Sequence, residues 1–320
     1  MKFNLLKELI REAETGIILG RRSGKRFRED GLRFIPTGRP KNLEISVKAK
    51  IFGIISKKPE VLVKISGFSK GWAAAANNFS YVSRNGKVDL EDQDGNEIHG
   101  HQSVKEGLQA WQDFDRGSER KSNVNRRDTM HLVLSLPGDE HDEQLKKAAH
   151  NFTQQTFPGH EYILALHTDT KNHHCHVIVK YRDDRNRALR VKKGDLQKWR
   201  EAFAESLHEE GVEANATPRQ VRGRFKRAEK QVFRHIPEER QRRLHRNSEE
   251  FDREAVERRN TERRGEVVEY WRTAAEAVER SKFGDAKENR ELAQRMRLFA
   301  EDMRQTKSQQ IASRDDSAER

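Results

Sequence analysis

The sequence predicts an α+β fold, with an antiparallel or mixed sheet flanked by helices and a charged, mostly helical C-terminal extension. Three observations support this prediction. Between residues 58 and 215, short apolar runs typical of strands alternate with longer amphipathic segments typical of helices. Two apolar runs near the middle are separated by a short polar stretch, which indicates a hairpin and hence antiparallel strands. Beyond residue 228 the chain is dense in Glu, Arg, Lys, Gln and Ala and has no strand pattern.

The composition limits the size of the core and the kind of partner. Of 320 residues, 33% are hydrophobic and 36% are charged, so we expect a core formed by about half of the chain. The net charge of +12 favours a polyanion such as nucleic acid, although a basic soluble protein without a specific partner has the same charge. The single cysteine, Cys175, excludes a disulfide within the chain and fits a reducing compartment. No apolar run reaches the roughly 18–20 residues that span a bilayer, and the start does not read as a secretory signal, so we expect a cytoplasmic protein without membrane insertion.

Residues 1–57 are interpreted as a basic N-terminal arm. The arm begins with a short amphipathic helix, because its apolar residues fall at helical spacing: Phe3, Leu5, Leu6, Leu9 and Ile10. The stretch Gly20–Lys48 is rich in Gly, Arg and Lys. Such a stretch is most often a flexible, solvated segment, and the alternative is an arm that follows the phosphates of a nucleic acid.

The α+β domain is predicted to cover residues 58–225. Its expected elements are, in chain order, a strand at Val61–Ser66, a helix at Lys70–Arg84, a hairpin or loop at Lys87–Gly95, a helix at Ser103–Gly117, a strand at Thr129–Pro137, a helix at Asp139–Phe157, strands at Tyr162–Leu166 and Val177–Val179, and a helix at Lys192–Gly211. Gly67 is expected to end the first strand, and Ser103 is expected to cap the second helix.

Residues 226–320 are predicted to form a charged helical tail that is partly disordered. Apolar residues are sparse in this part of the chain, so extended or paired helices fit it better than a full second core.

A cluster of histidines stands between the two apolar runs of the predicted hairpin. Alternate residues of a strand share a face, so His174 and His176 point the same way while Cys175 points to the opposite, apolar side. A turn after His167 would bring that residue back beside the pair. One histidine on a strand is most often a core residue, but three imidazoles at these spacings favour a divalent-metal site.

Two neighbours of the three histidines, Asp169 and His173, are interpreted differently. Asp169 would either accept a hydrogen bond from a ligand histidine or take up a proton. His173 is set aside as a ligand, because strand alternation turns it away from His174. Imidazole ligands suit Mn²⁺, Zn²⁺, Co²⁺ and Ni²⁺, whereas Mg²⁺ prefers oxygen and would need phosphate ligands as well.

A metal site in a basic protein raises the question of a nucleophile. The chain has four tyrosines, and Tyr81 stands near the end of a predicted helix with Arg84 close by. A tyrosine on a helix is most often a packing residue. Arg84 favours the functional interpretation of Tyr81, since a guanidinium binds phosphate well.

The residues of the hairpin resemble those of a known family. The His-Cys-His of residues 174–176 fits the His-hydrophobe-His element of the HUH endonucleases, and HTDTKNHHCHVIVK is similar to the third motif of plasmid relaxases. The resemblance is closest to the MobP class, which includes the T-DNA border endonuclease. In that class the first motif is a strand followed by a helix with the nucleophilic tyrosine, and VLVKISGFSKGWAAAANNFSYVSRNGKVDLED resembles it with Tyr81 at that position. HLVLSLPGD is similar to the second motif, with its serine at Ser135, and NATPRQVRG resembles a basic segment that follows the core.

The resemblance covers about residues 60–225 and implies an HUH relaxase fold. It implies a relaxase that nicks one strand at a plasmid transfer origin (oriT), for conjugative transfer or mobilisation. Tyr81 would attack a phosphodiester of single-stranded DNA and form a 5′-phosphotyrosine intermediate, with Asp169 assisting proton removal or fixing a histidine tautomer. A divalent ion, first of all Mn²⁺ or Mg²⁺, would be held by His167, His174 and His176. The expected DNA contacts are Arg84, Ser135, Arg219 and Arg222.

The same resemblance implies further partners, namely accessory proteins of a relaxosome and the coupling protein of a type IV secretion system. One departure is Cys175 at the hydrophobe position, where a buried cysteine is expected to behave as a small apolar residue. Two other functions stay open. A rolling-circle replication initiator of the HUH group is less favoured, because such proteins have their tyrosine after the histidines. A non-catalytic, metal-stabilised DNA-binding protein is the alternative outside the enzymes.

Overall fold

The computed structural model of this protein describes residues 47–116, 126–170, 172–192, 194–225, 253–282 and 285–318, together with Lys7 and Ile10. The expected N-terminal helix, most of the basic arm and the first part of the predicted tail therefore lie outside the described residues. By its contacts the chain divides into two units, one formed by residues 58–216 and the other by residues 1–57 with 217–320. This division assigns residues 217–225 to the second unit, whereas the sequence predicts that the α+β domain extends to residue 225.

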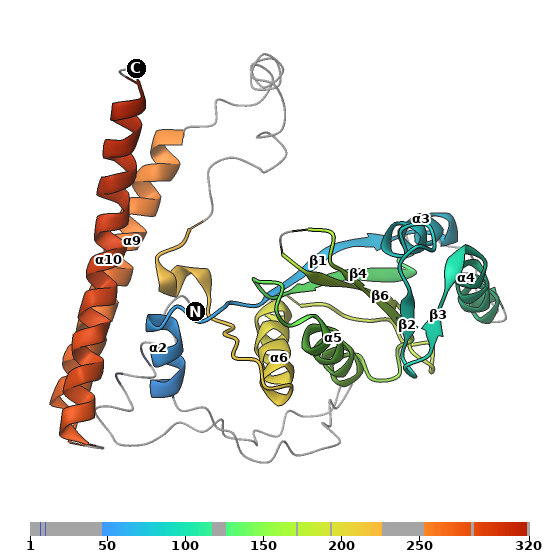
Figure 1. The fold of residues 1–320 in the computed structure, drawn as a ribbon, viewed down its shortest axis with the longest axis horizontal. Helices are drawn as coiled ribbons and strands as arrows, with labels where there is room; N and C mark the ends of the chain where they lie inside the picture. The colour runs from blue at the N-terminus through green and yellow to red at the C-terminus, as the bar shows by residue number, and fades with distance from the viewer. Residues whose placement is uncertain are drawn as a thin grey trace. The chain divides into compact units, whose positions relative to one another are not determined.

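The first unit is built on one six-stranded sheet (Figure 1). Its strands are β1 (Leu62–Ser69), β2 (Leu90–Asp92), β3 (Glu97–Ile98), β4 (Thr129–Ser135), β5 (Tyr162–His167) and β6 (His174–Lys180). They lie in the order β1-β4-β6-β5-β2-β3, and every neighbouring pair is antiparallel. The predicted α+β fold with an antiparallel sheet is confirmed.

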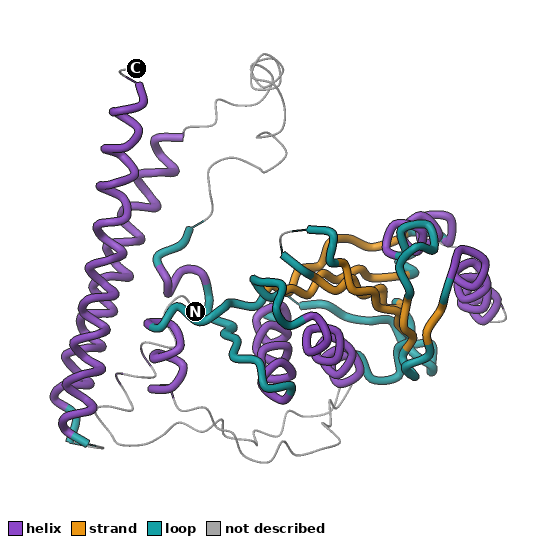
Figure 2. Tube along the Cα trace, viewed as in Figure 1, coloured by secondary structure: helices purple, strands orange, loops and turns teal. Residues whose placement is uncertain are grey.

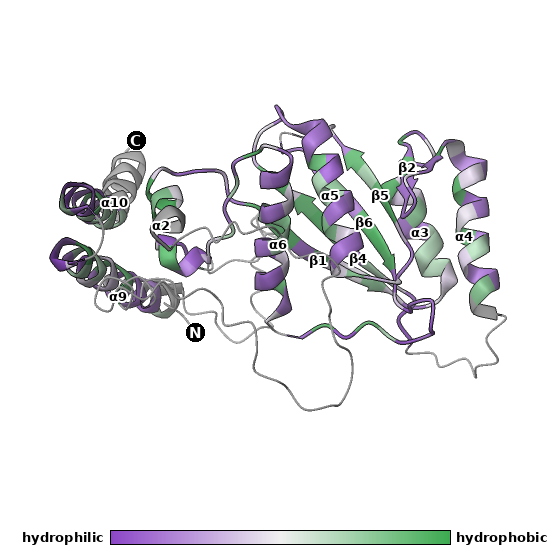
Figure 3. Cartoon of the chain, turned by 90° about the horizontal axis from the view of Figure 1, so that it is seen from below, coloured by the Kyte–Doolittle hydropathy of each residue, from purple (hydrophilic) through white to green (hydrophobic). Residues whose placement is uncertain are grey.

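Helices cover both faces of this sheet (Figure 2). They are α3 (Trp72–Val82), α4 (Gly100–Arg116), α5 (Asp142–Thr156) and α6 (Asp195–Glu209). The strands between them are buried on both sides, which is why β4 and β6 read as nearly continuous apolar runs rather than as alternating ones. Figure 3 shows the same division, with the central strands hydrophobic and polar residues on the outer faces of α5 and α6.

Alternate residues of β6 serve the two cores. Cys175 and Val177 pack with α5 and α6, whereas Ile178 packs with α3 and α4. Cys175 is fully buried, and burial raises the pKa of its thiol, so it behaves as the small apolar residue that the sequence predicted.

Two local expectations were wrong. The first strand does not end at Gly67 but continues to Ser69 across a bulge, a distortion that glycine accommodates well. Ser103 is not an N-cap, because α4 already begins at Gly100, whose positive φ of 77° turns the chain out of β3.

The second unit contains α2 (Val47–Ile55), the short 3₁₀ helix η1 (Arg219–Arg222), α9 (Arg253–Arg280) and α10 (Ala286–Ala318). The long helices α9 and α10 run along each other (Figure 1). Their apolar residues are few but fall on one stripe, so that they form a narrow core around Trp271, whose indole donates a hydrogen bond to the carbonyl of Val221 at 2.8 Å. Among the described residues, no helix is long and apolar enough to cross a membrane.

Candidate functional site

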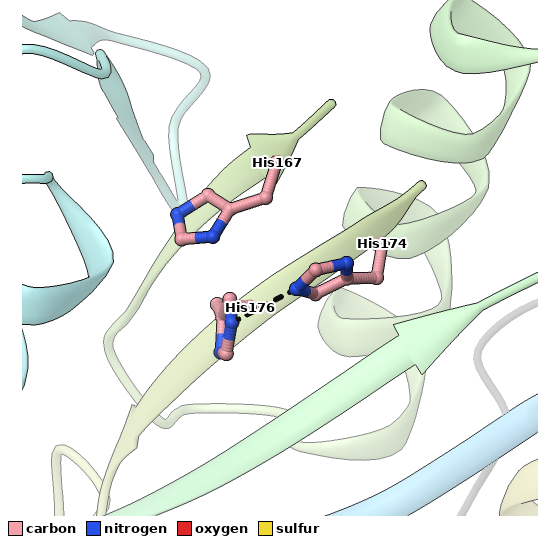
Figure 4. Close-up of side chains that lie close together, drawn as sticks. All are labelled: His167, His174 and His176. Atoms are coloured by element: carbon pink, nitrogen blue, oxygen red, sulfur yellow. Dashed lines mark hydrogen bonds between the residues drawn. The ribbon is translucent and has the colours of Figure 1, made fainter. Parts of the chain in front are cut away.

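The three predicted ligand histidines converge at one end of the β5–β6 hairpin (Figure 4). His167 ends β5 and pairs directly with His174, the first residue of β6, while His176 lies two positions further along the same strand. Paired and alternate residues share a face, so all three imidazoles lie on the side of the sheet that α3 covers. One candidate ligand atom from each lies within 4.8 Å of those of the other two.

Hydrogen bonds to backbone carbonyls determine which nitrogen each ring can offer. Nε2 of His167 lies 2.7 Å from the carbonyl of Val82, and because a carbonyl only accepts, Nε2 carries the proton. Nδ1 of His167 therefore has a free lone pair, and within the described chain this buried atom has no partner. Nδ1 of His174 donates to the carbonyl of Asn172 at 3.1 Å, which leaves its Nε2 facing Nε2 of His176 at 3.2 Å.

This arrangement fits a metal ion. Carbonyl acceptors that orient ligand imidazoles are the usual outer partners of metal-binding histidines. Burial lowers the pKa of His167 and lowers that of His176 to about 3, so both rings are neutral at neutral pH, as ligands must be. Three imidazole nitrogens that lie this close together suit a shared cation, and three protein ligands leave positions open for a substrate.

Tyr81 stands beside this cluster. It lies in the last turn of α3, and its side chain is 55% exposed although the neighbouring Phe79 and Val82 are buried. Its ring is perpendicular to that of His176, with 5.6 Å between the ring centroids, and it lies 6.5 Å from that of His167. The structure thus brings together a tyrosine and histidines that are about 90 residues apart in the sequence.

A tight turn after α3 places Arg84 next to Tyr81, and Arg84 in turn pairs with Asp169 from the loop after β5. Arg84, Asn85 and Gly86 all have positive φ, of 51°, 58° and 80°. Positive φ is the left-handed backbone region, and two consecutive residues other than glycine in that region store backbone strain, which is found most often at functional sites. The Arg84 guanidinium lies 5.3 Å from the centroid of the Tyr81 ring and donates to Oδ2 of Asp169 at 2.7 Å. Asp169 therefore pairs with an arginine in this state.

Ser135 of β4, which pairs with His174, and His173 hold the start of β6 in place. The Ser135 hydroxyl donates to the carbonyl of His173 at 2.9 Å, and its side chain is nearly buried. His173 is turned toward α5, where its Nδ1 lies 2.6 Å from a carboxylate oxygen of Asp142. These contacts keep His173 apart from the cluster of His167, His174 and His176.

The two arginines expected to bind DNA beyond the core, Arg219 and Arg222, lie on η1 in the helical unit. Their DNA contacts stay a prediction.

A second polar cluster on the same face was not identified from the sequence. His131 in β4 has Nε2 within hydrogen-bonding distance of the hydroxyls of Ser69 and Thr129, and Asn78 of α3 donates to Ser69. The signal was present in Thr129–Ser135, an apolar strand whose polar residues stand at positions of one parity and hence on one face.

A comparison with protein families identifies the relaxase family. Residues 81–212 match a family model described as a relaxase, MobA/VirD2-like, nuclease domain. The matched segment begins at the exposed tyrosine and includes all three clustered histidines, whose order fits the His-hydrophobe-His pattern. A comparison with curated proteins finds no match.

Proposed function

We propose that this chain, which carries a MobA/VirD2-like relaxase nuclease domain, nicks one strand of DNA at a plasmid transfer origin by a metal-assisted transesterification. The domain implies an endonuclease that binds single-stranded DNA. The observation that carries the proposal is the position of Tyr81, an exposed phenol at the end of a helix whose ring contacts two of the three clustered imidazoles.

In this proposal Tyr81 is the nucleophile. Its phenolic oxygen attacks the phosphorus, the bond from phosphorus to the 3′-oxygen breaks, and the products are a 5′-phosphotyrosine and a 3′-hydroxyl that takes up a proton. A phenol has a pKa near 10, so its proton must be removed or its anion stabilised near neutral pH. Arg84 lies beside the ring and supplies a positive charge for the developing phenolate or for the phosphate.

His167, His174 and His176 would hold a divalent ion, which when bound would polarise the non-bridging oxygens of the scissile phosphate. Mn²⁺ or Mg²⁺ is proposed first, and Zn²⁺, Co²⁺ and Ni²⁺ also suit imidazole ligands. Asp169 would act once the DNA phosphate competes for Arg84, because the carboxylate is then free to accept a proton or a hydrogen bond from a histidine.

The adduct conserves the energy of the phosphodiester, so the same site can reverse the reaction and close the strand. This reversibility suits conjugative transfer or mobilisation. We propose that accessory proteins at the origin and a type IV secretion coupling protein are the partners. No observation on the described residues favours a replication initiator or a non-catalytic DNA-binding protein over this function.

Replacement of one oxygen tests the nucleophile. We expect wild-type protein with Mn²⁺ to relax a supercoiled plasmid that carries the origin, and to leave a protein–DNA adduct that survives denaturing electrophoresis. Tyr81→Phe removes the attacking oxygen and should abolish the adduct, at least about 10³-fold, while single-strand affinity stays within a few-fold.

Tyr181→Phe is the matched control, because Tyr181 is a partly exposed tyrosine that packs against Phe68 and not against the histidines. It should form the adduct at the wild-type rate. Adduct formation by Tyr81→Phe would refute the assignment of the nucleophile, and the absence of any adduct from wild-type protein would refute the proposed function.

A further inference from the structure

The polar cluster around His131 lies on the same face of the sheet as the metal-binding histidines. In the register of β4 with β6, Val133 pairs with His176 and His131 pairs with Ile178. His131 is therefore two positions along the neighbouring strand from the level of His176. Between the two levels this face of the sheet is open: Val133 is half-buried, and Lys64, with which it pairs, is exposed. We call this part of the face the open strip.

Tyr81 and the cluster also share one side of α3. Residues three apart on a helix lie on the same side, so Asn78 faces the open strip together with Tyr81. Phe79 and Val82 instead point into the core between α3 and the sheet. Tyr81 thus stands at one end of the strip, and Asn78 and His131 stand further along it.

The hydrogen bonds of the cluster select one tautomer of His131. The amide nitrogen Nδ2 of Asn78 lies 2.9 Å from Oγ of Ser69 and 3.0 Å from the carbonyl of Ala74, and it can only donate to both. Ser69 is 1% exposed, and its own hydroxyl hydrogen needs an acceptor. The acceptor within reach is Nε2 of His131, at 3.1 Å.

The hydroxyl of Thr129 leads to the same result. It lies 2.9 Å from the same Nε2, and Thr129 is fully buried. If Nε2 carried the proton, both hydroxyl hydrogens would be left without an acceptor among the described residues, whereas an unprotonated Nε2 has one lone pair and accepts from one of the two hydroxyls at a time. With Nε2 as acceptor the proton is on Nδ1, for which no acceptor is found in the described part of the chain.

We propose that this N–H of His131 donates a hydrogen bond to a phosphate oxygen of the DNA strand whose scissile phosphate lies at the three histidines, an inference that rests on the proposed function. His131 is then a binding residue next to the reacting centre, and Asn78 is a positioning residue that acts through Ser69 by fixing the tautomer. Burial lowers the pKa of His131 to about 4, so the ring is neutral at neutral pH and binds as a hydrogen-bond donor, not as a charge.

Two substitutions separate the two ring nitrogens. In His131→Asn the side-chain amide nitrogen takes the place of Nδ1, whereas in His131→Gln the amide reaches the place of Nε2 and the Nδ1 donor is lost. The test is the affinity of each variant and of wild type for fluorescein-labelled dT, dA and dC 20-mers, measured in EDTA by fluorescence anisotropy. His131→Gln should weaken binding about tenfold to hundredfold, and His131→Asn should keep it within about threefold of wild type.

The loss should be equal on the three oligonucleotides, because a phosphate contact carries no sequence information. The slope of log Kd against log salt should not change, because a neutral donor releases no counterion. Unequal losses would assign the contact to a base edge and overturn the proposal. Wild-type affinity in His131→Gln would overturn it as well.

The tautomer is tested without DNA. Nitrogen-15 shifts of the wild-type ring should show a protonated Nδ1. Thr129→Val leaves the Ser69 hydroxyl as the one hydroxyl donor to Nε2 among the described residues, and the proton should stay on Nδ1. When Asn78→Asp is added to Thr129→Val, the carboxylate accepts from the Ser69 hydroxyl, Ser69 then accepts from Nε2, and the proton should move to Nε2. Protonation of Nε2 in the wild type would refute the tautomer, and no change between Thr129→Val and the double variant would refute the role of Asn78.

The control is His160→Asn, which alters another histidine whose pKa burial lowers, but one that donates to the carbonyl of Lys180 away from the strip. It should bind the oligonucleotides as wild type does. The experiment also distinguishes the two proposals. If wild-type protein binds the oligonucleotides but forms no adduct, the transesterification alone is refuted. If wild-type protein forms the adduct and His131→Gln binds the oligonucleotides as tightly as wild type, this inference alone is refuted.

Discussion

At the scale of single residues, the hydrogen bonds of the histidines allow the proposed metal site to be tested by comparing a proposed ligand with a histidine next to it in the sequence. His174 and His173 are adjacent in the sequence, but Nε2 of His174 faces His176 whereas His173 binds Asp142. His174→Gln should therefore lower Mn²⁺ affinity by more than about tenfold. Loss of a residue that only hydrogen-bonds to a metal ligand already costs about that much, and loss of a ligand should cost more. His173→Gln should leave it unchanged, as measured by calorimetric titration of the metal-free protein. Equal effects of the two substitutions would contradict the ligand assignment.

His131 gives the unfolding free energy a defined dependence on pH. Its pKa is about 4 in the folded protein and near 6.5 in the unfolded chain. Below pH 6.5 the unfolded chain binds a proton that the folded one does not, so acid favours unfolding. Between pH 6.5 and pH 4 this group should remove about 3 kcal/mol of stability, and above pH 6.5 its contribution should be constant.

Urea unfolding of wild type and of His131→Gln at several pH values measures this contribution as the difference between two curves. The other histidines act equally in both proteins and cancel. Parallel curves would mean that His131 titrates normally in the folded state.

At the scale of elements, the turn that follows α3 is the most constrained segment near the site. A Cβ atom at Gly86 would overlap the backbone of His101, and Gly86 has a φ of 80°. Gly95 has nearly the same φ, 82°, but has open space around it. Gly95→Ala should cost about 1 kcal/mol, the conformational term alone, and Gly86→Ala clearly more, since the overlap adds to it.

Urea midpoints measure both effects, and Gly86→Ala should also slow adduct formation, because the turn places Arg84 beside Tyr81. A loss of stability that is the same at both glycines would show that the turn can move away from His101.

The elements also show what the sequence could and could not predict. The hairpin, the shared face of His174 and His176, and the opposite face of Cys175 follow from strand alternation alone. The bulge in β1 could not be predicted, because it depends on pairing with β4. The Asp169–Arg84 ion pair could not be predicted either, since it joins loops 85 residues apart, and the tautomers depend on carbonyls such as that of Val82.

At the scale of the whole molecule, the two ends of the first unit, residues 58–216 (the nuclease unit), are joined to each other. The amide of Val61 donates to the carbonyl of Asn215 at 2.8 Å, the amide of Asn215 donates to Pro59, and Lys58 pairs with Glu213. The two cores next to the sheet lie wholly within residues 58–216. We therefore expect a fragment of residues 58–216 to unfold cooperatively and to bind Mn²⁺ within a few-fold of the full chain.

Circular dichroism and metal titration of the fragment check this expectation. A fragment that lacks a cooperative transition would show that the helical unit is needed for the nuclease unit to fold.

The order of the strands has a consequence for how the protein is made. β6 is the last strand of the sheet to be synthesised, yet it lies between β4 on one side and β5 on the other. While the chain is emerging from the ribosome, the β1–β4 pair and the β5–β2–β3 group have no common partner. The strand that joins them also carries two of the three histidines. If the proposed site is the catalytic one, we expect a nascent or truncated polypeptide that already displays Tyr81 to be unable to cut DNA, and the capacity to cut to appear in one step, when β6 inserts.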